Sequence, residues 1–348
     1  MARNQRIFYA CQAVVIAPRG TTTLTEDYVV HGAQSVGMTS SFTLDQVFEL
    51  GQIEIYENIE EVADVEVTIE KVIDGDKLIY DLATNGACKT GVVPASKARS
   101  DVYVGIFDDG LNQATGVPRN ICMNSGMFVS SVSYSYSVDS SATESVTLVG
   151  NDRFWNDYAG VTAAPSTVWS NADLLGAGTN PIDGGDIPKS GVVRRVNVDI
   201  NSSAIPNVVR SQGGDDAAAE AGISDNAHIQ SISVSTDFAQ ENIQELGRFG
   251  PYTRYATFPI EVTCDFEVIA TSGDLINVSG AAPNLTNEQI RIQDTAGTVL
   301  DLGTKNKLSS VSYTGGDTGG GNATVTFSYS NFNVLTVDGG SLGPAPGE

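Results

Sequence analysis

The sequence predicts an all-β protein with minor α content, organised as two tandem β-sandwich domains. Three observations lead to this prediction. The chain nearly repeats itself, the repeated segments alternate apolar and polar residues, and only 18% of residues are charged. Soluble domains usually contain about 25% charged residues. Ser, Thr, Asn and 36 Gly take their place in this chain, and that mixture favours strands and turns over long helices.

The repeat is most evident in two segments. Residues 34–51 read QSVGMTSSFTLDQVFELG and residues 230–247 read QSISVSTDFAQENIQELG, an offset of 196 (230 minus 34). SSVSY occurs at 130–134 and again at 309–313, an offset of 179 (309 minus 130). VEVT at 65–68 also matches IEVT at 260–263, and VTL at 146–148 matches VTF at 325–327 at the offset of 179. The last match predicts two hairpins of equal length.

Each half therefore contains four strand candidates in the same order. They are residues 34–43, 64–73, 129–138 and 144–149 in the first half, and 230–238, 260–268, 308–314 and 323–330 in the second. We expect one domain at 1–175, a linker rich in Gly and Pro at 176–191, a second domain at 192–340 and a flexible tail at 341–348.

The remaining segments predict little helix. Short helices are expected at 95–100 and 217–221. The N-terminal stretch MARNQRIFYACQAVVIAP weakly resembles a signal peptide, but Gln12 interrupts it and no A-x-A site follows, so we interpret it as a buried first strand. The long stretch 76–128 has only a shorter counterpart in the second half, and we expect it on the outer surface.

The predicted strands have two different faces. In one strand Val65, Val67 and Ile69 alternate with Glu66, Thr68 and Glu70, the pattern of a half-exposed strand. An ordinary antiparallel sheet would explain this alternation. It does not explain why the polar face has almost no Lys or Arg, because exposed sheet edges usually carry Lys to prevent pairing. We therefore expect edges that pair with another copy of the chain.

Composition and motifs argue against several other functions. With 42 acidic and 19 basic residues, the chain has the opposite charge to a nucleic-acid-binding protein. His31 and His228 lie in no metal-binding or catalytic motif, GGDTGGGNAT at 315–324 suits a hairpin tip, and the Asp-Gly turns at 74–76, 108–110 and 183–186 do not have EF-hand spacing. We predict no enzyme, no metal and no cofactor. The four cysteines, Cys11, Cys88, Cys122 and Cys264, have no close spacing, which predicts free thiols in a reducing compartment.

Three stretches resemble the tail tube proteins of tailed bacteriophages. They are FELGQIEIYENIEEVADVEVTIEKVIDGDKLIYDLAT at 48–84, SYSVDSSATESVTLVGND at 135–152 and YATFPIEVTCDFEV at 255–268. The resemblance implies small β-sandwich domains that each contribute four strands to a large intersubunit β-barrel. Six domains close a ring, and stacked rings form a tube with an acidic lumen through which DNA passes during infection. The protein would then be made in the host cytoplasm and end in the virion tail.

The resemblance also implies roles for particular residues. The polar face would line the lumen, and its predicted residues are Ser35, Thr39, Glu66, Thr68, Glu70, Ser131, Ser133, Ser231, Ser235, Glu261, Thr263, Asp265 and Glu267. Segments 44–64 and 240–259 would dock one ring on the next through Leu50, Tyr56, Leu246 and Tyr252. The alternative is that these four side chains pack on their own domain.

Two tube-type domains in one chain favour a trimeric ring with pseudo-six-fold symmetry over a hexamer. Sheath, tape measure, baseplate and terminator proteins are the other implied partners. Genomic DNA would pass without specific binding, and no membrane anchor is expected.

Two other functions fit the composition. A surface adhesin or carbohydrate-binding β-sandwich should carry a signal peptide and an exposed aromatic platform, whereas the chain has only Trp155 and Trp169. A tail terminator, capsid decoration or baseplate protein would not need two matched polar faces.

Overall fold

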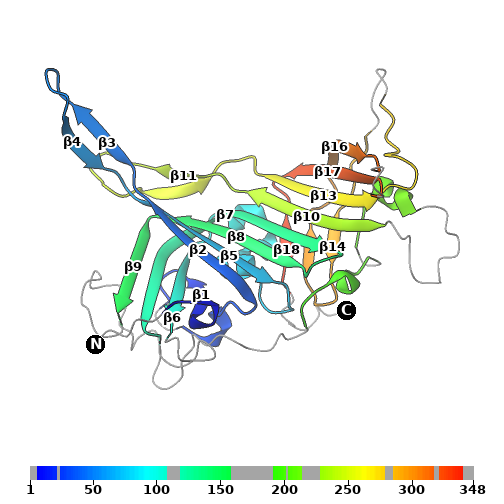
Figure 1. Cartoon of the computed structure of the whole chain (residues 1–348), viewed down its shortest axis with the longest axis horizontal. Helices are drawn as coiled ribbons and strands as arrows, with labels where there is room; N and C mark the ends of the chain where they lie inside the picture. Colours follow the sequence, from blue (N-terminus) through cyan, green and yellow to red (C-terminus); the bar gives the residue numbers. More distant parts are fainter. Residues whose placement is uncertain are drawn as a thin grey trace.

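A computed structural model describes residues 6–21, 24–107, 118–157, 191–200, 203–213, 228–278, 285–316 and 321–339. Its centre is an open antiparallel sheet of eight strands (Figure 1). In spatial order these are β2 (Ala33–Ser41), β5 (Asp64–Val72), β8 (Thr143–Gly150), β7 (Asn120–Ser137), β10 (Ile229–Asp237), β13 (Glu261–Ile269), β17 (Thr324–Phe332) and β16 (Lys307–Thr314). All eight predicted strands are present, and β7 begins nine residues earlier than predicted (129 minus 120).

The spatial order of the strands repeats along the sheet. The first half supplies β2, β5, β8 and β7, and the second half continues with their counterparts β10, β13, β17 and β16. The last strand of the first half, β7, pairs with the first strand of the second half, β10. The two halves are thus joined side by side, and β2 and β16 form the outer edges of this sheet.

Bulges in the ladders show which residues are equivalent. The β2–β5 ladder shifts register between Ala33 and Ser35, and the β10–β13 ladder shifts between Ile229 and Ser231. The β7–β8 and β16–β17 ladders shift between Val129 and Ser131 and between Leu308 and Ser310. These positions keep the sequence offsets of 196 (229 minus 33) and 179 (308 minus 129).

The strands paired with these have other offsets, β5 relative to β13 and β8 relative to β17. The predicted matches of 65–68 with 260–263 and of 146–148 with 325–327 are therefore wrong by two residues. At the bulges Glu70 corresponds to Glu267, an offset of 197 (267 minus 70), and Thr147 to Ser328, an offset of 181 (328 minus 147). The hairpins also differ in length, because the pair Ser135–Thr143 encloses residues 136–142 and the pair Thr314–Thr324 encloses 315–323. A slip of two leaves every side chain on its original face, so alternation alone did not reveal it.

One face of the sheet is covered by the other elements. β1 (Gln12–Pro18) pairs with β6 (Ser100–Ile106), which pairs with the start of β7, and β9 (Asp152–Asp157) pairs with the same part of β7. Under the second half lies a small sheet of β14 (Arg291–Gln293), β15 (Val299–Asp301) and β18 (Thr336–Asp338). The helices are α1 (Ile79–Ala83), α2 (Val92–Ala95) and α4 (Asn207–Arg210), with single 3₁₀ turns η1 (Tyr9–Cys11), η2 (Glu26–Tyr28), η3 (Ala87–Thr90), η4 (Arg195–Asn197) and η5 (Ser211–Gly213).

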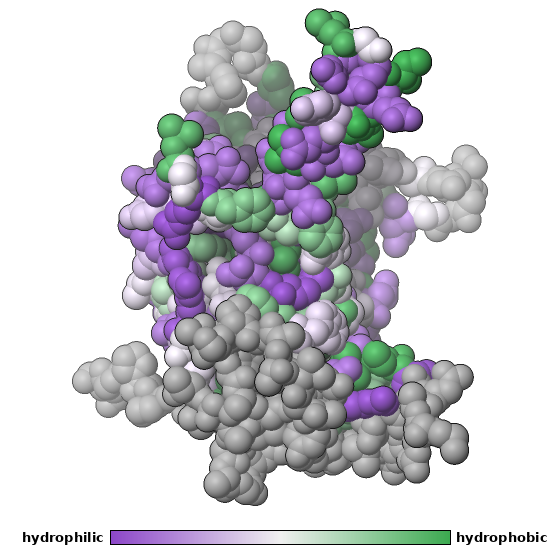
Figure 2. Space-filling model, turned by 90° about the vertical axis from the view of Figure 1, so that its left-hand side faces the viewer, coloured by the Kyte–Doolittle hydropathy of each residue, from purple (hydrophilic) through white to green (hydrophobic). Residues whose placement is uncertain are grey.

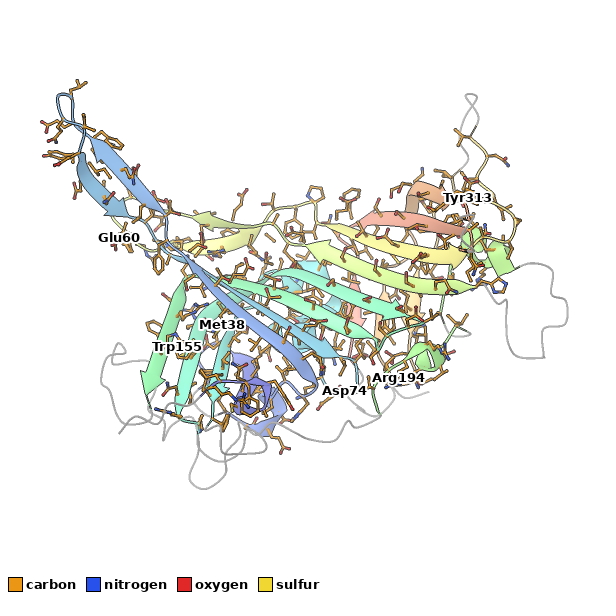
Figure 3. All side chains as sticks on the ribbon, viewed as in Figure 1. Met38, Glu60, Asp74, Trp155, Arg194 and Tyr313 are labelled. Atoms are coloured by element: carbon orange, nitrogen blue, oxygen red, sulfur yellow. The ribbon has the colours of Figure 1, made fainter. Side chains whose placement is uncertain are left out.

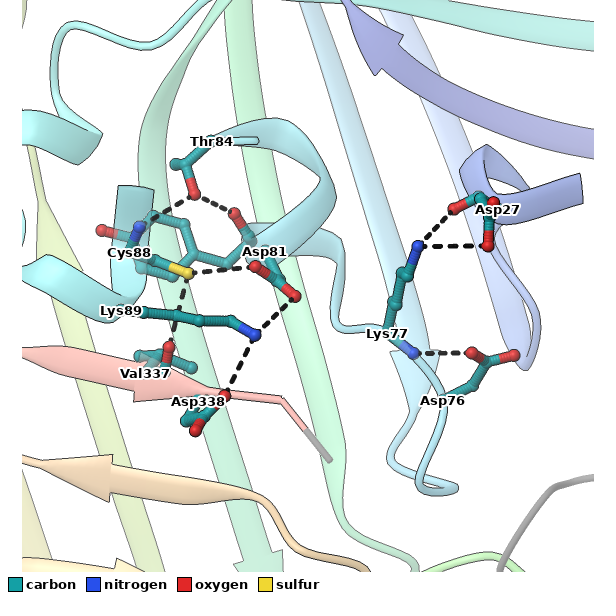
Figure 4. Close-up of polar contacts among 10 residues, drawn as sticks. Asp27, Asp76, Lys77, Asp81, Thr84, Cys88, Lys89, Val337 and Asp338 are labelled. Carbon is teal, nitrogen blue, oxygen red and sulfur yellow. Dashed lines mark hydrogen bonds and ion pairs between the residues drawn. The ribbon is translucent and has the colours of Figure 1, made fainter. Parts of the chain in front are cut away.

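The larger of two apolar core clusters in the described segments runs beneath both halves. It contains Val67 and Ile69 of β5 together with Phe266 and Phe327 of the second half. Polar contacts add to the join, since Lys89 Nζ lies 3.1 Å from Asp338 Oδ1 of β18 and 3.6 Å from Asp81 Oδ2 (Figure 4).

Several smaller predictions can be compared with the structure. The buried first strand is confirmed as β1, and the four cysteines are free and buried. The helix at 95–100 is wrong, because α2 ends at Ala95 and β6 begins at Ser100. The outer-surface position of 76–128 is also wrong for its described part, since Ile79, Leu82 and Val102 belong to the core.

Other predictions lie outside the described residues. These are the helix at 217–221, the tail at 341–348, the turns at 108–110 and 183–186, and the linker at 176–191 apart from Gly191. Among the helices of the described segments, none is long and apolar enough to span a bilayer.

Candidate assembly surfaces

The thirteen residues predicted to line a lumen share one face of the central sheet. The cross-strand registers place Thr39 opposite Glu66, Ser235 opposite both Ser133 and Thr263, and Ser231 opposite Glu267. Their neighbours along each strand, such as Val67 and Val262, belong to the core on the other face. None of the thirteen is buried. The polar face therefore continues from the first half into the second.

The polar face carries negative charge. Glu66, Glu70, Glu261, Asp265 and Glu267 contribute carboxylates, and none of them is buried. Within the eight described strands the only basic residues are Lys71 and Lys307. Lys71 is buried on the opposite face, and Lys307 is the first residue of the edge strand β16. The expectation that this face lacks Lys and Arg therefore holds apart from the start of one edge.

Hydroxyl groups hold some of these carboxylates at equivalent places. Ser35 Oγ donates to Glu70 Oε2 at 3.5 Å, and Ser231 Oγ donates to Glu267 Oε2 at 3.0 Å. The second bond is the first one shifted by the structural offsets, so the repeat extends to side-chain contacts. Ser233 Oγ donates to Asp265 Oδ2 at 3.4 Å in the second half only, because Gly37 occupies the corresponding position in the first.

The sheet ends in two edge strands, β2 from the first half and β16 from the second. β2 pairs only with β5, and β16 pairs only with β17. Figure 3 shows Met38 of β2 and Tyr313 of β16 far apart on the two sides of the sheet. Unpaired edge strands offer their N–H and C=O groups to a further strand.

Two hairpins extend the polypeptide beyond the same end of the sheet. β3 (Leu44–Phe48) and β4 (Ile55–Glu60) follow β2, and β11 (Gln240–Ile243) and β12 (Thr253–Ala256) follow β10. Both tips make the same turn, with Gln52 N–H donating to Glu49 O at 3.4 Å and Arg248 N–H donating to Glu245 O at 3.3 Å. Gly51 and Gly247 have φ of 103° and 83°, a conformation that favours glycine.

The predicted stacking residues are exposed on these hairpins. Leu50 and Leu246 have exposed fractions of 102% and 106%, and Tyr56 and Tyr252 are more than half exposed. Leu50 and Leu246 therefore do not pack on their own domain, whereas Tyr56 and Tyr252 are partly covered within the chain. Figure 2 shows apolar groups at the tip of a projecting hairpin, beside hydrophilic ones.

The two hairpins differ in what they contact. All residues of β3 and β4 are exposed, and the hairpin projects from the molecule (Figure 1). The β11–β12 hairpin instead lies against the first half. Its buried Arg254 donates from Nη2 to Asp64 Oδ1 and from Nε to Asn151 Oδ1 at 3.3 Å, and Arg99 Nη2 of the first half donates to Thr253 Oγ1 at 2.7 Å. Arg99 and Arg254 were not predicted from the sequence, because a single Arg carries no recognisable pattern.

The described segments contain no group of three His, Cys, Asp or Glu side chains placed to hold a metal ion. The polar face, the two edge strands and the hairpin tips are the features that recur in both halves or lie exposed at the ends of the sheet.

Comparisons with known proteins give one family match and several solved structures. The family described as Phi812 tail tube protein matches residues 12–91. The solved cap that terminates the tube of the anti-feeding prophage has 16% identity and a TM-score of 0.33, covering 45% of this chain and 95% of that one. A chain of the PVC sheath–tube complex, an extracellular contractile injection system in the extended state, has 14% identity and a TM-score of 0.32, covering 44% and 93%.

No curated protein matches the chain. The family match nevertheless confirms the resemblance predicted from the sequence, because residues 12–91 of this chain are similar to a tail tube protein family.

Proposed function

We propose that the protein is a structural, non-enzymatic component of a phage tail. Its copies form rings that stack into the tail tube, a hollow conduit with an acidic lumen for DNA ejection. The observation that carries the proposal is the polar face, which crosses both halves of one continuous sheet and has carboxylates on one strand of each half, β5 and β13. The sheath, tape measure, baseplate and terminator proteins are the further partners expected for such a tube.

The order of the strands supports a ring of three chains. Each chain supplies eight strands in which one half follows the other sideways, so three chains supply six repeats. If the second half formed a second ring or an outer decoration, it would not continue the sheet. With strands about 4.8 Å apart and tilted by about 40°, a barrel of about 24 strands has a backbone diameter of about 48 Å. Such a barrel leaves a wide aqueous lumen.

The lumen would act by like charge and shape. Carboxylates on its wall repel the phosphates of DNA, and screening at physiological salt limits this repulsion to about 8 Å. DNA near the wall is pushed inward and does not adsorb, so it slides without specific binding. Ser and Thr hydroxyls between the carboxylates keep the wall hydrated.

The exposed hairpins would join one ring to the next. Both leave the same end of the sheet and place Leu50, Tyr56, Leu246 and Tyr252 in solvent. Aromatic and apolar side chains of this kind become anchors when a partner surface covers them.

Negative-stain electron microscopy of the purified protein tests this function. We expect rings or hollow tubes with three chains per ring. Isolated monomers at high concentration, in the absence and presence of tail components, would contradict the proposal, and six chains per ring would contradict the trimer.

A charge reversal tests the lumen separately. Replacing Glu66, Glu70, Glu261 and Asp265 by Lys should permit tube assembly but slow DNA release from phage particles at least tenfold, because Lys attracts phosphates. The matched control replaces the same residues by Gln or Asn, which removes the charge and keeps the shape, and it should slow release less. Equal release by all three proteins would show that these residues do not line the channel.

A further inference from the structure

The seam between the two halves, where β7 pairs with β10, shows how two repeats join strand to strand. Along it, β7 and β10 pair with Ser133 opposite Ser235 and Tyr134 opposite Val234. The ladder continues past β10, because Phe238 N–H donates to Ser130 O at 2.7 Å. Phe238 then turns under the first half, where its ring lies 6.2 Å from that of Tyr80 and is fully buried.

The two outer edges of the sheet are the two sides of this seam, separated. β2 is the repeat of β10, and β16 is the repeat of β7, with bulges at matching positions. Residues that are buried at the seam are exposed at the edges. Tyr134 is 1% exposed and its counterpart Tyr313 is 52% exposed, while Phe238 is 0% exposed and its counterpart Phe42 is 72% exposed. Met38 and Val311 are likewise only partly buried, although Val234 and Val132 are buried.

We propose that β16 of one copy pairs antiparallel with β2 of a second copy in the register of the internal seam. Applying the offsets of 196 and 179 to that register places Thr39 opposite Ser312, Met38 opposite Tyr313 and Ser41 opposite Ser310. Phe42 takes the role of Phe238, so its N–H donates to Ser309 O of the other copy and its ring is buried beneath that copy's β16. This joint rests on the proposed function. It names the partner, a second copy of the chain, and the residues that form each contact within a ring.

The joint is heterologous, because each copy contributes a different edge. Such contacts repeat head to tail and end only when a ring closes. In this joint every strand of the ring gains two neighbours, and the polar faces of successive copies continue without a step, as they do across β7 and β10.

Cysteine cross-linking tests the register. Val138 N–H and Phe238 N–H donate across the seam to Gln230 O and Ser130 O, so by alternation Ser133 and Ser235 form a non-hydrogen-bonded pair. The Cα atoms of such a pair lie about 4.5 Å apart. This distance falls in the range of about 4.4–6.8 Å between the Cα atoms of disulfide-bonded cysteines. The double variant Thr39→Cys, Ser312→Cys in the full chain should therefore form disulfides between chains on mild oxidation, in a ladder that ends at three chains. The four native cysteines are buried and do not compete.

Two matched variants serve as controls. Thr39→Cys with Ser310→Cys moves one thiol by two residues on the same face, and it should cross-link at least tenfold less. Ser133→Cys with Ser235→Cys should form a disulfide within one chain. Equal or stronger cross-linking of the shifted pair would overturn the register, and tubes without any cross-link in the matched pair would overturn the joint while supporting the tube. Cross-linked trimers without tubes would support the joint and contradict the proposed function.

A Phe42→Ser variant tests the buried ring without the cross-link. Because Phe42 is exposed in the single chain, its loss should leave the melting temperature of the unassembled protein unchanged and raise the concentration needed for ring formation at least tenfold. Phe48→Ser, which removes another exposed ring from the hairpin, should leave ring formation unaffected. If the two variants form rings equally well, Phe42 has no part in the joint.

Discussion

At the scale of single residues, one pair of opposite positions holds charged side chains in the first half and apolar side chains in the second. In β5 and β8, Lys71 lies opposite Glu144, and both are fully buried. The structurally equivalent positions in β13 and β17 hold Val268 opposite Val325, also fully buried. Lys71 forms its ion pair with Asp74, at 3.3 Å from Nζ to Oδ1, and apolar replacements of buried charges are often at least as stable. The carboxylate of Glu144 therefore needs a local reason.

The reason is the N-terminus of helix α1. Glu144 accepts hydrogen bonds from Ile79 N–H at 2.6 Å, Tyr80 N–H at 3.0 Å and the Tyr134 hydroxyl at 3.0 Å. The first N–H groups of a helix have no partner within it, and a carboxylate there also favours the helix dipole. Burial raises the pKa of Glu144 above its ordinary value, whereas Lys71 and these hydrogen bonds lower it.

Replacing Glu144 by the residue of the second half should therefore be costly. We expect Glu144→Val to lower the free energy of unfolding by about 3–5 kcal/mol, because it orphans the buried Ile79 and Tyr80 N–H groups and the buried Tyr134 hydroxyl. Ser145→Val, on the exposed face of the same strand, should change it by about 0.5 kcal/mol or less. Urea denaturation measures both, and equal effects would show that the carboxylate does not hold the helix.

At the scale of elements, the two hairpins begin from nearly the same sequence and differ in their partners. The tips share one turn, but only β11–β12 has another repeat beside it within the chain. Arg254 reaches across to Asp64, Asn151 and Gly150 O of the first half. The contact is local and polar, so it holds the hairpin without adding to the core.

Arg254→Met should release this hairpin. Hydrogen bonds to charged groups contribute about 1.5–3 kcal/mol, so amide exchange in Thr253–Ala256 should accelerate at least tenfold in a hydrogen-exchange experiment. Arg248→Met at the tip, where Arg248 only lies over the Tyr252 ring at 6.0 Å, should leave exchange in β12 unaffected. Unchanged protection in both variants would mean that backbone pairing alone holds β12.

At the scale of the whole molecule, the sheet provides lateral contacts through its edges and the hairpins provide contacts along the strands. These directions are separate, so each can be impaired alone. Leu50 and Leu246 lie at the hairpin tips, outside the edge strands, and are exposed in the chain.

Leu50→Asp combined with Leu246→Asp should therefore permit rings but shorten tubes several-fold, because buried anchors at the ring contact become charged. Electron microscopy measures tube length and counts single rings. Val93→Asp, an exposed change on α2, is the matched control and should give tubes of ordinary length. Long tubes from the double variant would show that the tips do not carry the stacking contact.

Much of the fold was predictable because the relevant signals are local. Period-two alternation identified all eight strands and the face on which Glu66 and Glu261 lie, since side chains alternate wherever a strand forms. The predicted offsets between β2 and β10 and between β7 and β16 were also correct. The offsets of β5 and β8 relative to the second half were wrong by two, because alternating sequences match equally well after a slip of two. The helix at 95–100 and the outer position of 76–128 failed because burial against other segments, and not propensity, shapes that region.

The sequence by itself determined the all-β class, the duplicated set of four strands and the acidic polar face, because strand formation and alternation depend on near neighbours. Only the tertiary structure decided that β7 pairs with β10 and that β5 and β8 are offset by 197 and 181 from β13 and β17. It also decided that Phe238 is buried while Phe42 is exposed. Those facts depend on which strands meet in space, and long-range pairing leaves no periodic signal in the chain.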